Sequence, residues 1–291
     1  MTSGEPIEIS AAAAVGVVSL LSLSLLFWLL RWFLFGSAKD QESGHHELPK
    51  LPFGWFEFGI FFWALIACGA IGIFFTASLL PAPPEDESAR RAWEGLAAAV
   101  QTAGMQVGAL IGIGLCLFII RRRYAELFFR FDISGIRIFW ISLDTYIRFL
   151  PVVWVIAGLW MMVLTLLQQY GVSGIDLEQQ KIVEMLASAE DLYLIFLLGF
   201  TAVLLAPVVE EVVFRGILYR FLCQKFNLWF GLIFTNILFA LAHANLFRFL
   251  PLFFLGLLLC WLYEKYKDIR IPILFHMFFN GMSVAMTVWI T

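Results

Sequence analysis

The sequence is poor in charged residues. Asp, Glu, Lys and Arg make up only 14% of its 291 residues, whereas 62% are hydrophobic and the mean hydropathy is +0.88. Soluble domains average about 25% charged and about 45–50% apolar residues, so this composition excludes a sizeable soluble domain. The net charge is −3, and the 19 Lys and Arg residues are scattered between hydrophobic segments. Nucleic acid is therefore not an expected partner, because nucleic-acid-binding surfaces cluster their basic residues.

Cysteine is also scarce, and common zinc-binding motifs are absent. The four cysteines, Cys68, Cys116, Cys223 and Cys260, lie in or beside hydrophobic segments and form no CxxC or CxxH pattern. We interpret them as small buried residues. The HExxH motif of many zinc hydrolases is absent as well.

Long hydrophobic segments dominate the sequence. A transmembrane helix needs about 20 apolar residues, and such segments predict an all-α, polytopic membrane helix bundle with about eight transmembrane helices. The first segment follows Glu5 and Glu8 instead of the basic start of a signal peptide, so we expect it to remain in the chain. The expected spans are 10–35, 55–80, 95–120, 149–167, 192–213, 228–245, 247–264 and 271–290.

Basic residues predict the orientation of the bundle. With eight spans the loops form two sets, which hold 15 and 4 of the Lys and Arg residues. The positive-inside rule places the richer set, including 121–123, in the cytoplasm. Both termini are therefore expected on the non-cytoplasmic side.

A glycine repeat predicts close packing between two helices. Gly104, Gly108 and Gly112 recur every four residues and share one helix face, where a neighbouring helix can approach closely. We expect this face to pack within the chain rather than against a second copy.

Polar side chains in the last four spans are not explained by a membrane-spanning role alone. An ionisable residue at the centre of a membrane helix costs about 2.5–3.5 kcal/mol to insert, so an intramembrane carboxylate indicates a functional site by default. The chemistry is therefore expected in the C-terminal third of the chain. The residues concerned are Glu210, Glu211, Arg215, Asn236, His243, Asn245, His276 and Asn280.

Helical spacing separates the two glutamates. Adjacent helix positions point ~100° apart, so Glu210 and Glu211 cannot face one point in the same way. Arg215 follows Glu211 by four residues, the spacing of a helical ion pair. We therefore expect Glu211 to be the buried partner of Arg215 and Glu210 to face elsewhere.

The remaining polar residues supply the parts of a hydrolytic site. His276 and Asn280 share one face of their helix, as do Phe239 and His243. A carboxylate or His can take a proton from water, and His or Asn can donate to a developing oxyanion. The alternative is that these side chains join the helices through hydrogen bonds worth about 1–2 kcal/mol or less each. Taken together with the glutamate pair, they favour chemistry.

Three motifs in this region resemble those of the CPBP family (CAAX protease, or Abi) of intramembrane glutamic endopeptidases. "EEVVFR" at 210–215, "FALAH" at 239–243 and "HMFFN" at 276–280 look like EExxxR, FxxxH and HxxxN, in family order and in successive membrane segments. The family includes type II CAAX prenyl endopeptidases and proteins linked to bacteriocin self-immunity. The resemblance covers about residues 200–291, and the first four spans carry no motif of this family.

The resemblance implies a glutamate-dependent endopeptidase. Glu210 and His243 would orient and deprotonate the catalytic water, while His276 and Asn280 would stabilise the tetrahedral oxyanion.

The resemblance also implies a supporting pair and a division of the chain. Glu211 and Arg215 would hold the site together, with Arg215 as a further group near the oxyanion. Residues 1–148 would form a membrane region of three helices and a basic interfacial segment. Residues 149–291 would form a protease-like core of about five helices.

No cofactor is expected. Glu210, His243 and His276 offer one oxygen and two nitrogens, as in some hydrolytic zinc sites, but they come from three separate helices. We therefore favour a metal-free site, with zinc at these residues as the alternative.

The favoured function is cleavage of a membrane-associated or lipid-modified peptide or protein, with the lipid bilayer as the other partner. The alternative is a non-catalytic immunity or scaffold protein on the same fold. A transporter is a third reading, but no repeat relates the first four spans to the last four. Short loops favour a bacterial inner (plasma) membrane.

Depth along the helices conflicts with this grouping. Counted from the expected cytoplasmic loops at ~1.5 Å per residue, Glu210 and His243 lie ~22–24 Å deep but His276 only ~9 Å. The three can meet only if their helices are staggered, tilted or broken.

Overall fold

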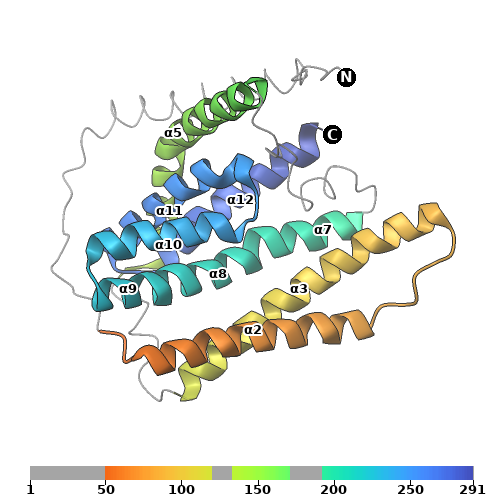
Figure 1. Cartoon of the computed structure of the whole chain (residues 1–291), viewed down its shortest axis with the longest axis horizontal. Coiled ribbons are helices and arrows are strands. Elements are labelled where there is room, and N and C mark those ends of the chain that lie inside the picture. Colours follow the sequence, from red (N-terminus) through yellow and green to blue (C-terminus); the bar gives the residue numbers. More distant parts are fainter. Residues whose placement is uncertain (1–49, 120–132, 171–191, 291) are drawn as a thin grey trace.

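The computed structural model describes residues 50–119, 133–170 and 192–290, and every regular element in these ranges is a helix (Figure 1). Two short π-helical segments, η1 and η2, lie within the helix that contains the fifth expected span. The elements are α2 (Trp55–Ser78), α3 (Glu87–Ile119), α5 (Gly135–Gln169), α7 (Leu192–Phe200), η1 (Thr201–Leu205), α8 (Ala206–Glu211), η2 (Val212–Tyr219), α9 (Arg220–Lys225), α10 (Leu228–Ala242), α11 (Leu246–Tyr266) and α12 (Arg270–Ile290).

The helices define a multi-pass integral membrane protein. Within the described ranges six helices are long and apolar enough to cross a membrane, with the unbroken helix 192–225 counted once, and α10 is a shorter apolar helix. The predicted fold class is therefore confirmed. The expected first span, 10–35, and the basic run 121–123 lie outside the described residues. The total of eight spans, the side of the termini and the division at 148/149, which falls inside α5, stay predictions.

Several expected spans are longer in the structure, and two of them differ most from the expected bounds. Helix α5 begins at Gly135 rather than at 149, and the fifth span continues beyond 213 to Lys225. Arg215 and Arg220, which the orientation count took as loop residues, are only 0% and 5% exposed within that helix. The prediction that these two residues lie in a loop was wrong, so they give no information on which side of the membrane the loops face.

The continuous helix α7–α9 lies between the α2–α3 pair and α10 (Figure 1). One apolar cluster joins α2 and α3 to residues 209–222 of this helix, and a second joins α5, α10, α11 and α12. Phe214 packs against both clusters. The glutamate pair at 210–211 therefore lies where the two cores meet.

A tight turn ends α10 at the site. The sequence predicted a span that reaches residue 245. The helix ends earlier, and His243 is its C-cap. Ala244 adopts a left-handed φ of 47°, and Asn245 caps α11 by accepting the N–H of Arg248 at 3.1 Å. The polar residue Asn245 thus has a local backbone role.

The start of α12 is buried in the protein. Asp268 and Ile269 are both 0% exposed. Arg270, the first residue of the helix, forms an ion pair with Asp268 at 2.6 Å and donates to the Ile133 carbonyl at 3.2 Å. Ser142 of α5 donates to the Ile271 carbonyl at 3.1 Å. These contacts fix the end of α12 that leads to His276.

The glycine repeat packs α3 against α2, as predicted. A Cβ atom on Gly108 would lie 2.1 Å from the Cys68 carbonyl oxygen, and one on Gly72 would lie 2.0 Å from the Gly104 carbonyl oxygen. Only glycine permits backbones to approach this closely.

We expect Gly108→Ala to destabilise the protein, because its methyl group has no space against α2. Overpacking of this kind costs about 1–3 kcal/mol, so the melting temperature in detergent should fall. Gly114→Ala on the same helix is the matched control, since a Cβ there meets nothing within 4 Å. Equal melting temperatures for the two variants would contradict close packing of α2 on α3.

Candidate active site

Glu211 links two helices through one carboxylate oxygen. Its Oε1 accepts a hydrogen bond from Arg215 Nη1 at 2.9 Å and lies 2.8 Å from His276 Nδ1. The side chains of Glu211 and Arg215 are 0% exposed and that of His276 is 2% exposed. The ion pair predicted from helical spacing is therefore present, and His276 joins it from α12.

Arg215 is enclosed on its remaining sides. Its guanidinium carbon lies 4.3 Å from the centre of the Phe239 ring, a cation–π contact. Nη2 lies 3.5 Å from Asn236 Oδ1 and 3.4 Å from the Gly256 carbonyl. These partners hold the guanidinium in place, in keeping with a supporting role.

Gly256 is a site residue that sequence reasoning missed. A Cβ atom there would lie 2.3 Å from Asn236 Oδ1 and 3.2 Å from Arg215 Nη2, so the arginine pocket requires glycine. A single glycine in an apolar helix gives no signal of such a role. The sequence marks Asn236 as an intramembrane polar residue but indicates no partner for it.

Glu210 faces two imidazoles. Its Oε2 lies 4.0 Å from His243 Nε2 and 3.9 Å from His276 Nε2, and this buried oxygen has no hydrogen-bond partner among the described residues. Distances near 4 Å are too long for a direct hydrogen bond and suit a bridging water. The two adjacent glutamates thus have different surroundings, as their spacing predicted.

The second nitrogen of each imidazole is occupied. His243 Nδ1 lies 2.8 Å from the Phe239 carbonyl oxygen, and His276 Nδ1 lies 2.8 Å from Glu211 Oε1. A carbonyl and an arginine-paired carboxylate can only accept, so Nδ1 carries the proton in both rings. In both rings Nε2 is therefore the nitrogen that faces Glu210.

Asn280 bonds to the backbone of the helix that carries the glutamates. Its Nδ2 donates to the Ala202 carbonyl in η1 at 2.9 Å. The structure thus groups Glu210, Glu211, Arg215, His243 and His276 tightly, and places Asn280 one turn further along α12 against the glutamate-bearing helix.

The conflict in depth disappears because the helices are irregular. His243 stands at the end of a short helix, π-helical segments flank the glutamates, and α12 starts inside the protein. The sequence predicted that Glu210, His243 and His276 could meet only if their helices were irregular or staggered in this way.

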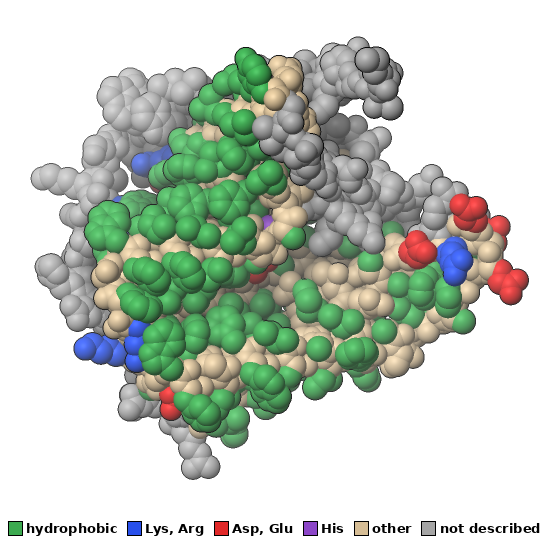
Figure 2. Space-filling model, in the orientation of Figure 1, with side chains coloured by type: hydrophobic (Ala, Val, Ile, Leu, Met, Phe, Trp, Pro, Cys, Tyr) green, Lys and Arg blue, Asp and Glu red, His purple; other side chains and the backbone are tan. Residues whose placement is uncertain are grey.

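The site reaches the surface in a hollow. Figure 2 shows acidic and histidine side-chain atoms near the centre of this face, between hydrophobic side chains. The side chains of Glu210 and His243 are 22% and 20% exposed, respectively. A small substrate group could therefore approach Glu210 from this side, while Glu211 and Arg215 stay sealed.

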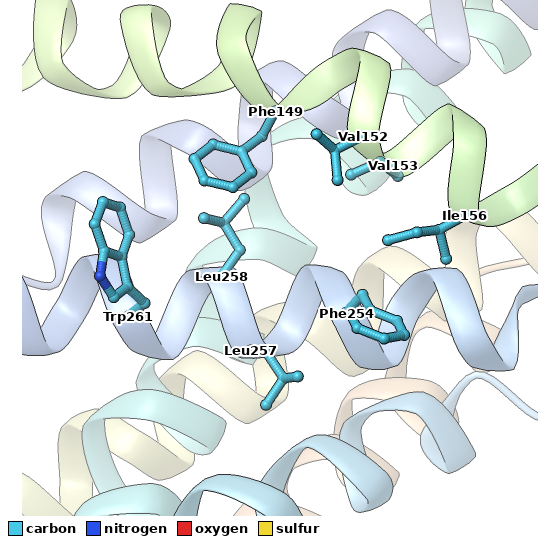
Figure 3. A pocket seen from close by; sticks show the side chains of 8 residues that line it. All are labelled: Phe149, Val152, Val153, Ile156, Phe254, Leu257, Leu258 and Trp261. Carbon is cyan, nitrogen blue, oxygen red and sulfur yellow. The ribbon is translucent and has the colours of Figure 1, made fainter.

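A separate apolar cavity of about 320 Å³ lies between α5 and α11 (Figure 3). Its walls run from Phe149 to Ile156 on α5 and from Phe254 to Trp261 on α11, without an ionisable side chain. It contains none of the three motifs and is not the site of the proposed chemistry.

The arrangement of the described residues also bears on metal binding. Within the described parts of the chain, no group of three or more His, Cys, Asp and Glu side chains is arranged to hold a metal ion. The expectation of a metal-free site stays a prediction.

Comparison with known proteins gives a match to a family model and matches to individual proteins. Residues 192–282 match the model of the type II CAAX prenyl endopeptidase Rce1-like family. "Putative membrane peptidase YdiL" of Bacillus subtilis (strain 168) is 28% identical over 144 residues, which cover 47% of this chain and 57% of that protein. An "Uncharacterized 24.3 kDa protein" of Escherichia coli is 33% identical over 82 residues, 26% of this chain and 38% of that protein. No solved structure matches.

These matches support the resemblance drawn from the three motifs. The segment that matches the family model, 192–282, contains all six motif residues. The chain spans about half the length, or less, of the two relatives, so their whole activities do not transfer to it directly.

We predict that Glu211→Gln and Arg215→Met both lower the melting temperature in detergent. Each change leaves the other member of a fully buried ion pair without its partner, which costs about 3–5 kcal/mol. Glu210→Gln should melt like the unaltered protein, because Glu210 has no ion-pair partner within hydrogen-bonding distance. Equal losses in all three variants would refute the division of roles between the two glutamates.

Proposed function

We propose that the protein is an intramembrane endopeptidase in which Glu210, His243 and His276 activate a water molecule. The supporting observation is the approach of two imidazole Nε2 atoms to within 3.9 and 4.0 Å of one carboxylate oxygen. This arrangement lies inside a membrane helix bundle, where an unused carboxylate is costly. The family match to 192–282 agrees with the proposal.

The proposed resting state of this site depends on how many hydrogen-bond donors and acceptors meet there. A water between these groups has two hydrogens but faces three acceptors: Glu210 Oε2 and the Nε2 atoms of His243 and His276. All three are satisfied only when one of them carries a proton. The three groups therefore share one proton in the proposed resting state.

The proposed reaction uses these groups in turn. Glu210 or His243 takes a proton from water while the water oxygen bonds to the carbonyl carbon of the scissile peptide. Protonated His276 donates from Nε2 to the resulting oxyanion. The proton taken from water then passes to the leaving amine as the carbon–nitrogen bond breaks. Glu211, fixed by Arg215, orients His276 throughout.

The proposed substrate is a membrane-associated or lipid-modified peptide or protein. Glu210 and His243 are partly exposed within a bundle whose outer surface is largely apolar (Figure 2), so the scissile bond must be held beside the bilayer. We propose a bacterial inner membrane location, in keeping with the bacterial relatives.

We predict that Glu210→Ala and His243→Ala each abolish cleavage, and that the double variant is no worse. Groups that act as one unit show non-additive losses. The measurement compares the terminal peptides of membrane proteins in cells that carry each variant. Glu94→Gln, an exposed carboxylate on α3, is the control and should retain every cleavage. Identical terminal peptides with and without Glu210 would favour a non-catalytic immunity or scaffold protein.

A metal measurement tests the proposed mechanism separately. We expect purified active protein to contain far less than one zinc per chain and to keep its activity in a chelator. A zinc enzyme would lose activity to the chelator and regain it on addition of zinc. Stoichiometric zinc together with reversible chelator inhibition would replace the glutamate-only mechanism.

A further inference from the structure

The carbonyl of Ala202 lacks its usual backbone partner. In an α-helix it would accept the N–H of Ala206, but that N–H bonds to the Thr201 carbonyl in the π-helical turn. The next residue, Pro207, has no N–H to donate. The side chain of Asn280 supplies the missing donor from α12, with Nδ2 2.9 Å from the Ala202 oxygen.

We infer that Asn280 is a positioning residue: it replaces the donor that Pro207 lacks and so holds η1 in its π-helical form. Close packing of the two segments supports this role. A Cβ atom on Gly281 would lie 3.6 Å from Val203 Cγ1, so α12 runs directly against η1 at this point. An unpaired carbonyl in an apolar bundle is costly, and a neighbouring side chain is one of the few groups that can satisfy it.

The π-helical turn sets the direction of the glutamates. It accommodates one more residue than an α-helical turn, and a shift of one residue rotates the following side chains by ~100°. Glu210 and Glu211 come three and four residues after Pro207. If η1 relaxed to an α-helix, both carboxylates would turn away from His243 and His276. Asn280 therefore fixes the register of the carboxylates from the helix that also carries His276.

This role differs from that of an oxyanion donor, which the motif resemblance implies for Asn280. A positioning residue acts through η1, so its loss should be relieved when residue 207 regains an N–H. An oxyanion donor acts on substrate, so its loss should be the same whichever residue stands at 207. The consequence for cleavage rests on the proposed function, whereas the contact with Ala202 does not.

The first test is a double-mutant cycle on stability. Asn280→Ala should lower the melting temperature in detergent by several degrees, and by less than half as much when Pro207→Ala is also present. Pro251→Ala, a helical proline in α11, is the control background and should leave the full loss. An equal loss in the Pro207→Ala background overturns the inference. If Asn280→Ala alone fails to fold, the addition of Pro207→Ala must restore folding. Failure to fold in both backgrounds also overturns the inference.

The second test applies the same cycle to the membrane peptides whose termini depend on Glu210. Asn280→Ala should reduce their cleavage at least tenfold, and adding Pro207→Ala should recover most of it. A loss on the order of 10²–10³-fold in both backgrounds is the result expected of an oxyanion donor and would overturn the positioning role. If no cleavage depends on Glu210, the proposed function fails, and the stability cycle still decides the role of Asn280.

Discussion

One buried oxygen atom, Oε1 of Glu211, joins the parts of this site. It lies 2.9 Å from the Arg215 guanidinium on its own helix and 2.8 Å from the His276 imidazole on α12. All three side chains are sealed from the surface, so no solvent can replace a lost partner. The energetic cost of an unpaired charge in this setting constrains how far the two helices can slide or rotate against each other.

That constraint gives two neighbouring carboxylates different surroundings. Oε1 of Glu211 contacts both Arg215 and His276, whereas Oε2 of Glu210 faces two imidazole nitrogens at 3.9–4.0 Å. The bond from Glu211 also fixes the tautomer of His276, so that its Nε2 is directed at Glu210. Glu211, which has a supporting role in the proposed reaction, thus orients His276 toward Glu210.

Irregular backbone makes this arrangement possible inside a membrane. Regular helices would have left Glu210 and His276 at different depths, but the continuous helix α7–α9, which carries the glutamates, contains two π-helical segments. Irregular segments are tolerated in the bilayer only where neighbouring groups satisfy the backbone, and Asn280 does this for Ala202. Glycines at 72, 108 and 256 likewise admit backbone or amide groups that any side chain would displace.

The sequence by itself determined the helical membrane fold, the packing of Gly108 within the chain and the Glu211–Arg215 pair. Each follows from hydropathy or from spacing along one helix, which are local properties. Only the tertiary structure decided that His276 joins that pair, that Gly256 and Asn236 enclose the arginine, and that Asn280 bonds to Ala202. These contacts link segments tens of residues apart, and helix ends, π-helical turns and close approaches between helices are not encoded in residue spacing along one helix.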